Sequence, residues 1–230
     1  MKNSKTKKNI LVVVAHPDDE ILGCGGTIAK YSKTYNINLC ILSDGESSRN
    51  LNKSQLEIKI KNRKIMSKKA SKIIGFKKIF YANFPDNRFD SVDLIHIIKF
   101  IENVIRISNP ETVYTHYEND LNIDHRITFQ AVQTAARPQL RSKIKNIFSF
   151  YIPSSTEWNF SENNYFFPNV YEDISKNFIT KINALKIYKD ELRKSPHPRS
   201  IVNITALDTV NGEKVGFKKA EVFKLIRMLK

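Results

Sequence analysis

One imidazole and three carboxylates lie together in residues 15–20, which read Ala-His-Pro-Asp-Asp-Glu. His16 and Asp19 are three positions apart, so both side chains can reach one metal ion. Asp18 then remains free to accept a proton from water, as a general base does in metal-assisted hydrolysis. Pro17 and acidic residues are also typical of an ordinary helix start, which is the alternative interpretation of this segment.

The elements around this segment predict the fold. The apolar run at residues 10–14 is typical of a buried parallel strand. Further strands are predicted at residues 37–42, 78–81, 112–116 and 146–151, and helices at residues 20–32, 54–74, 91–107, 124–136, 174–192 and 217–229. Strands that alternate with helices of this length indicate an α/β protein with a Rossmann-like, mainly parallel sheet, helices on both faces and a C-terminal helical embellishment.

The length of 230 residues suits one α/β domain and is short for two. We expect residues 1–8, which are rich in lysine, to form a basic disordered tail and residues 9–230 to form a single domain. The apolar run after the tail is only five residues long and leads into the acidic segment, so a signal peptide is not expected. An apolar stretch of 18 residues does not occur, and we therefore expect no transmembrane segment.

The formal net charge of +15 comes mostly from lysines, which are spread through residues 53–78 and the tail. They are not interleaved with aromatic residues in a nucleic-acid-binding module, so nucleic acid is not an expected partner. A general bias toward lysine, asparagine and isoleucine explains the charge, with an anionic small-molecule substrate as the alternative. Cys24 and Cys40 have no metal-type spacing and are expected as reduced core residues, which favours a cytoplasmic location.

The predicted strand-to-helix junctions all fall at one edge of the sheet, where open α/β sheets bind their ligands. His16 and Asp19 follow the first strand, and His125 follows the fourth. Two nitrogens and one oxygen would leave a position open for water, as in catalytic zinc sites. Asp18 is adjacent to these residues and suits a general base that acts on that water, with a helix cap as the alternative.

These residues resemble the motifs of a known family. Residues 15–20, followed by Leu-Gly-Cys-Gly-Gly-Thr at 22–27, are similar to the signature of the PIG-L/LmbE-like family of zinc-dependent N-acetyl sugar deacetylases. Asp-Leu-Asn-Ile-Asp-His-Arg at residues 120–126 resembles that family's second motif. Weaker similarities follow the family's order at residues 43–46, Arg63, residues 85–87, Lys181, Tyr188 and residues 220–223. The resemblance covers about residues 9–228.

The resemblance implies the chemistry of the site. His16, Asp19 and His125 match the zinc ligands, and Asp18 matches the general base that takes a proton from the attacking water. The substrate would be the N-acetyl group of an amino sugar or a sugar conjugate, including nucleotide-linked and lipid-linked sugars. The products would be acetate and a free amine.

Other matching positions imply substrate contacts. Glu46, Arg63 and Asp86 match residues that hold sugar hydroxyls or organise the pocket, and a structural hydrogen-bond network is the alternative. His197 and Arg199 lie in a segment with two prolines and could reach an anionic part of the substrate, unless the segment is simply a surface loop. Relatives often assemble into trimers or hexamers, which makes a homo-oligomer one possible state, but the sequence identifies no interface.

One departure concerns the proton donor. Asn122 stands where many family members carry a histidine that steadies the oxyanion or protonates the leaving amine. An asparagine amide can donate a hydrogen bond but cannot supply a proton at neutral pH. Asp18 would then perform both proton transfers, or His116 or His197 would help. A metal-dependent amidase for a non-sugar acyl amide and a non-catalytic nucleotide-sugar-binding module are the two alternative functions.

Overall fold

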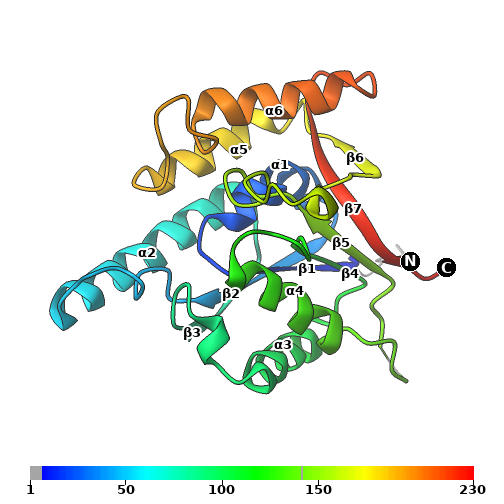
Figure 1. Cartoon of the computed structure of the whole chain (residues 1–230). Coiled ribbons are helices and arrows are strands. Elements are labelled where there is room, and N and C mark those ends of the chain that lie inside the picture. Colours follow the sequence, from blue (N-terminus) through cyan, green and yellow to red (C-terminus); the bar gives the residue numbers. More distant parts are fainter. Residues whose placement is uncertain (1–6, 141) are drawn as a thin grey trace.

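A seven-stranded sheet forms the centre of this computed structural model, which describes residues 7–140 and 142–230 (Figure 1). The strand order is β3-β2-β1-β4-β5-β7-β6. The strands are β1 (Asn9–Val14), β2 (Asn36–Ser43), β3 (Lys78–Phe84), β4 (Thr112–His116), β5 (Asn146–Phe150), β6 (Val170–Asp173) and β7 (Ala220–Met228). The helices are α1 (Asp19–Tyr31), α2 (Lys53–Ile74), α3 (Leu94–Ser108), α4 (Ile123–Ala135), α5 (Phe178–Leu185) and α6 (Ile201–Glu213), with short 3₁₀ turns η1 (Phe89–Ser91), η2 (Glu162–Asn164) and η3 (Lys186–Tyr188).

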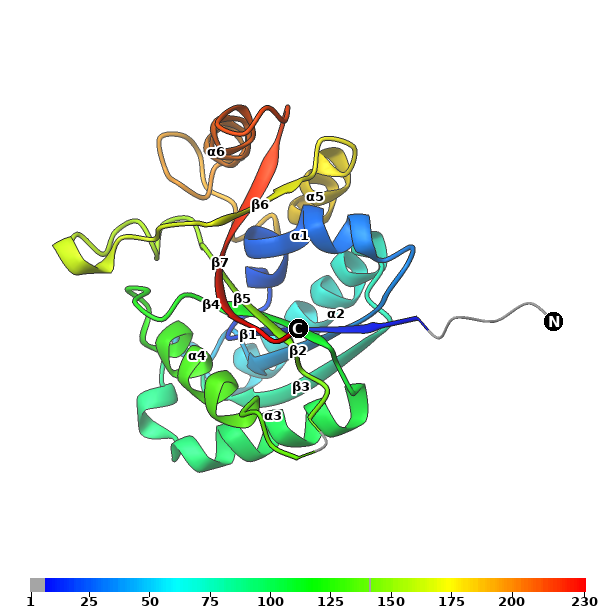
Figure 2. The same cartoon turned by 90° about the vertical axis from the view of Figure 1, so that its right-hand side faces the viewer.

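The predicted fold class is confirmed. Strands β1 to β5 pair in parallel, whereas β7 runs antiparallel to β5 and β6. Helices α3 and α4 cover one face of the sheet, and α1, α2, α5 and α6 lie on the other side (Figure 2). Most of the predicted basic tail, residues 1–6, lies outside the described residues. Within the described ranges, we find no helix whose length and apolarity would allow it to cross a bilayer.

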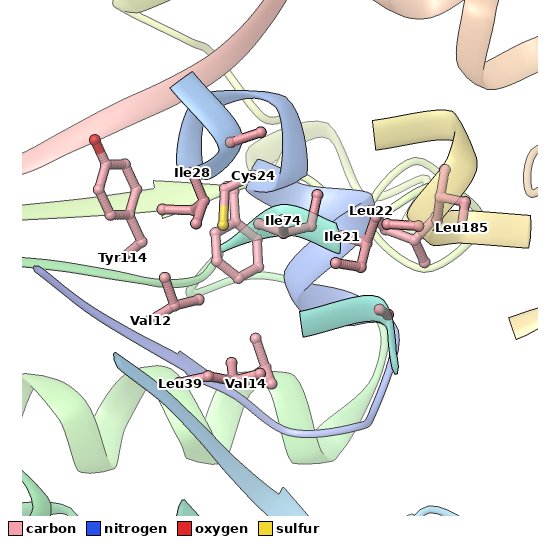
Figure 3. Close-up of a cluster of buried hydrophobic side chains, with 14 of the residues drawn as sticks. Val12, Val14, Ile21, Leu22, Cys24, Ile28, Leu39, Ile74, Tyr114 and Leu185 are labelled. Carbon is pink, nitrogen blue, oxygen red and sulfur yellow. The ribbon is translucent and has the colours of Figure 1, made fainter. Parts of the chain in front are cut away.

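Strand β1 is central because its side chains are apolar on both faces. Val12 and Val14 pack beneath α1 and α2, in the cluster shown in Figure 3. Leu11 and Val13 point to the other face and pack with residues of α3 and α4. Because side chains alternate between the two faces of a strand, every residue of the apolar run at 10–14 lies in one of the two cores. This burial is expected for a parallel strand that is covered on both sides.

The position of β1 also creates the crevice that holds the site. β1 pairs with β2 on one side and with β4 on the other. After β1 the chain forms β2 and β3 on one side of β1, and it then crosses over to form β4 on the other side. The carboxyl ends of β1 and β4 therefore form a topological switch point. Segments that follow these two strands meet there.

The C-terminal part of the chain differs from its prediction. The prediction of a helix at residues 217–229 is wrong, because most of this segment forms strand β7. Its apolar residues fit either a helix or a strand, and the backbone groups of β5 and β6 decide between them by pairing with β7. The helix expected at 174–192 is shorter, comprising α5 and η3. Helix α6 and strand β6 were not predicted.

Helix α1 contains a kink that the last strand stabilises. Cys24 has φ −149° and ψ 17°, which lie outside the helical range. The kink frees the amides of Gly26 and Thr27, which donate hydrogen bonds of 2.9 and 2.7 Å to the Glu221 carboxylate in β7. Glu221 thus caps the second half of α1, as an acidic side chain does at a helix N-terminus.

A buried ion pair supports this cap. Lys181 Nζ lies 2.9 Å from Glu221 Oε1 and 2.9 Å from Asp208 Oδ2, and all three side chains are buried. Burial raises the pKa of Asp208 to about 6, although Lys181 opposes the shift. One ammonium group therefore pairs with two carboxylates between α5, α6 and β7.

Lys181→Met should lower the free energy of unfolding by about 3 kcal/mol at pH 7, because two carboxylates stay buried without their cation. The loss should be smaller at pH 5. Without Lys181, which lowers the pKa of Asp208, that pKa rises further, so the folded variant holds more of a proton than the wild type and its stability falls more steeply as the pH rises from 5 to 7. Urea titrations at both pH values measure this difference. Lys186→Met, at an exposed lysine, is the control, and equal losses at both pH values would contradict the assignment.

Candidate active site

The three predicted metal-binding residues converge at the switch point. His16 Nδ1, Asp19 Oδ2 and His125 Nε2 form a triangle with sides of 3.1, 3.2 and 3.3 Å. Asp19 and His125 are fully buried, whereas 13% of the His16 side chain is exposed, so the triangle opens to solvent on the His16 side. These three residues could hold a metal ion.

Hydrogen bonds orient the His125 ring toward the triangle. Asp120 Oδ1 lies 3.1 Å from His125 Nδ1, and its other oxygen accepts from Ser155 Oγ and Thr156 Oγ1 at 2.9 and 2.6 Å. Burial alone would raise the pKa of Asp120, but His125 and the hydroxyl donors lower it to about 2. A carboxylate on the far nitrogen fixes the tautomer that leaves Nε2 free for a metal. Asp120 belongs to the second motif, but no role was predicted for it.

Asp124 holds the other histidine in the same way. His16 Nε2 lies 3.0 Å from Asp124 Oδ2, while the second oxygen of Asp124 accepts the Phe89 N–H at 2.9 Å. Asp86 Oδ1 is 3.4 Å from the same His16 nitrogen. Burial lowers the pKa of His16, but Asp124 and Asp19 outweigh it and raise the value to about 10. The carboxylates around His16 therefore stabilise positive charge at this position, as the ligands of a metal ion do.

His116 lies behind His125 rather than in the crevice. Its ring stacks on that of His125 with centroids 3.9 Å apart and an interplanar angle of 15°. Its Nε2 accepts the Ala15 N–H at 2.9 Å, and the ring is fully buried. Burial and the neighbouring His125 hold the pKa of His116 well below its ordinary value. A neutral, enclosed ring supports the His125 ring but is poorly placed to give a proton to a substrate.

Asp18 borders the triangle in an unusual backbone conformation. Its φ of 122° and ψ of −27° lie where residues other than glycine are strained by about 1–3 kcal/mol. Arg199 Nη1 is 3.5 Å from Asp18 Oδ2. Burial raises the pKa of Asp18 to about 7, against the opposing charge of Arg199. A carboxylate with such a pKa can exchange a proton near neutral pH.

A cavity of about 270 Å³ lies beside His16 and Asp18. Three of the predicted substrate residues, Arg63, Asp86 and Arg199, are among those that line it. Glu46 lies behind Arg63, whose Nε donates to it at 2.9 Å.

Other cavity residues were not predicted. Glu191 accepts hydrogen bonds from Arg63 and from Arg49, the latter at 2.7 Å. Arg49, Glu191 and Arg193 line the cavity but lie in segments with no motif, so only the fold brings them to the site.

Two further candidates lie apart from the triangle. Asn122 caps α4, since its Oδ1 accepts the Asp124 N–H at 2.8 Å, and its Nδ2 donates to Asn87 Oδ1 at 2.8 Å. His197 packs against Trp158 with ring centroids 5.3 Å apart and accepts the Arg199 N–H at 3.0 Å. Both polar groups of Asn122 are thus engaged, and His197 is absent from the cavity lining.

Comparisons with known proteins agree with this fold. The family model described as PIG-L, GlcNAc-PI de-N-acetylase, matches residues 11–136. The "Uncharacterized deacetylase YaiS" of Escherichia coli is 30% identical over 196 residues, which cover 82% of this chain and 95% of that protein. The chain belongs to the PIG-L family, as its motifs predicted.

Two more proteins extend the comparison. A probable N-acetyl-alpha-D-glucosaminyl L-malate deacetylase 2 of Bacillus cereus is 27% identical, over 80% of this chain and 84% of that protein. The solved N,N'-diacetylchitobiose deacetylase of Pyrococcus horikoshii has a TM-score of 0.77 at 19% identity, covering 97% of this chain and 85% of that chain. The second likeness shows the shared fold.

The strain at Asp18 predicts an unusual order of stabilities. Asp18→Gly and Asp18→Ala both remove the carboxylate, but only glycine adopts a φ of 122° without strain. The glycine variant should therefore be the more stable of the two by about 1–2 kcal/mol, measured by urea unfolding. The same pair at the exposed helical residue Lys68 should give the opposite order. The opposite order at Asp18 as well would show that its backbone is unstrained.

Proposed function

We propose that this protein is a zinc-dependent N-deacetylase that hydrolyses the N-acetyl group of an amino sugar or sugar conjugate. The observation that carries the proposal is the triangle of His16, Asp19 and His125 beside the Asp18 carboxylate. Membership of the PIG-L family and the names of the deacetylase relatives support the same reaction. The products are acetate and a free amine.

The donor set fits zinc. Nitrogen and oxygen ligands about 2.0–2.1 Å from a tetrahedral zinc ion lie about 3.3 Å from one another. The sides of the triangle, 3.1 to 3.3 Å, agree with that spacing. His16, Asp19 and His125 would hold the ion and leave a fourth position open. A bound zinc ion supplies a polarised carbonyl and a water of lowered pKa.

Asp18 is the general base of the proposed reaction. It accepts a proton from the attacking water and returns that proton to the leaving nitrogen, which its pKa of about 7 allows. His116 is enclosed and Asn122 is engaged in a helix cap, so both are less suitable as donors than Asp18. Arg199 lines the same cavity and can donate to the carbonyl oxygen as negative charge develops there.

The cavity suits a single sugar ring. Its volume of about 270 Å³ is below the range of about 300–1,000 Å³ that is usual for larger ligands. Arg63 and Asp86 offer a donor and an acceptor for sugar hydroxyls, while Glu46 orients Arg63 from behind. Arg193 at the same cavity agrees with an anionic conjugate. A cytoplasmic location and a homo-oligomer stay predictions.

Asp18→Asn should reduce acetate release from N-acetylglucosamine or N,N'-diacetylchitobiose by at least about 10²-fold, because the attacking water loses its base. Bound zinc, measured by elemental analysis, should not change. Asp93→Asn, at an exposed aspartate, should leave the rate unchanged. Full activity of the Asp18 variant would refute the mechanism, and faster release from an N-acetyl amino acid would favour the non-sugar amidase.

Zinc should stabilise the folded chain, since the three donors converge only after folding. At 100 times its Kd, zinc should raise the free energy of unfolding by about 2.7 kcal/mol, measured by urea unfolding with and without EDTA. His16→Ala should abolish this increase, whereas His96→Ala, at an exposed histidine, should retain it. A wild-type protein that binds no divalent metal would exclude zinc.

A further inference from the structure

The backbone of Asp18 is held by a side chain that does not reach the cavity. Its amide N–H donates a hydrogen bond of 2.9 Å to Glu20 Oε2. Glu20 is fully buried, and it is absent from the residues that line the cavity. The carboxylate of Glu20 therefore accepts a hydrogen bond from the backbone of Asp18, the residue whose φ is 122°.

Glu20 is itself held from the other end of the chain. Its Oε1 accepts a hydrogen bond of 2.8 Å from the hydroxyl of Tyr188, which ends η3. Tyr188 is 1% exposed and is also absent from the cavity lining. One oxygen of Glu20 therefore meets the Tyr188 hydroxyl, and the other meets the Asp18 amide.

We propose that Tyr188 and Glu20 are positioning residues that hold Asp18 in its strained conformation, so that its carboxylate faces the cavity. This inference rests on the proposed role of Asp18 as general base. A strained conformation persists only where its surroundings over-determine it. The contacts of Glu20 provide such a restraint without any contact between Glu20 or Tyr188 and the substrate.

The two oxygens of Glu20 connect Asp18 to Tyr188. Each oxygen accepts from one donor, the Asp18 amide or the Tyr188 hydroxyl. A glutamine could keep both contacts, because its oxygen accepts from the Asp18 amide while its NH₂ group donates to the Tyr188 oxygen. A methionine keeps neither, so Glu20→Met should release Asp18 while changing the volume very little.

Tyr188→Phe is the sharpest test, because it removes only the hydroxyl. The kcat for acetate release from N,N'-diacetylchitobiose should fall about tenfold, because small displacements of a reacting group cost rate. KM and bound zinc should stay within about twofold of wild type, since Tyr188 belongs neither to the triangle nor to the residues that line the cavity.

Tyr31→Phe is the matched control. It removes a tyrosine–glutamate hydrogen bond of the same length, 2.8 Å, from Tyr31 in α1 to Glu172. Tyr31 is only half-buried, so this change should lower the melting temperature no more than Tyr188→Phe does, while leaving kcat unchanged. Equal kcat values for the two tyrosine variants, or a loss that appears in KM or bound zinc, would overturn the proposal.

Glu20→Met provides the second variant if Tyr188→Phe does not fold. It should lower kcat at least as much, and the double variant should be no slower than Glu20→Met alone, because both changes act through one hydrogen-bonded chain. Additive losses would overturn the proposal. An active Asp18→Asn variant would instead refute the proposed function, so the two failures are distinguishable.

Discussion

Buried carboxyl groups lie in and beside the crevice, and the positive charge that balances them determines how the rest of the site is built. They include those of Asp18, Asp19, Glu20, Asp86, Asp120 and Asp124. Removing so many anions from water is costly unless cations and hydrogen-bond donors accompany them. Imidazoles, two arginines and a tyrosine hydroxyl supply part of this compensation, and the converging triangle can supply the rest by holding a divalent metal.

The balance of charge also gives the adjacent residues Asp18 and Asp19 different roles. Asp19 lies between His125 and His16, and although burial opposes it, these rings hold the pKa of Asp19 well below its usual range. For the adjacent Asp18, burial outweighs Arg199 and Arg63 and raises its pKa. One carboxylate therefore stays charged as a ligand, while its neighbour can exchange protons.

The central part of the fold could be predicted from sequence because each parallel strand is apolar on both faces. The run at residues 10–14 has no other plausible place than a core. Strand β7 was predicted as a helix, because its apolar residues fit both periods and its pairing partners are distant in sequence. Helix α6 is rich in threonine, asparagine and β-branched residues, which are weak helix formers, so its propensity does not reveal it.

The residues of the site also divide into those that could be predicted from sequence and those that could not. His16, Asp18 and Asp19 lie in one short motif, so their chemistry could be predicted before any geometry was known. Other contacts of the site join distant segments: Glu191 meets Arg49 in the cavity lining across 142 residues, and Tyr188 meets Glu20 across 168. No local pattern encodes such contacts, because they depend on how the helices pack.

The cap that Glu221 places on the kinked helix has a consequence for biosynthesis. The ribosome produces residues 16–19 early, but the strand that caps their helix emerges about 200 residues later. Until then the two freed amides of α1 have no carboxylate partner, and Lys181 lacks one of its two counter-ions. The helix that carries Asp19 therefore reaches its final shape only after the last strand has been made, so this N-terminal site matures after synthesis of its own motif.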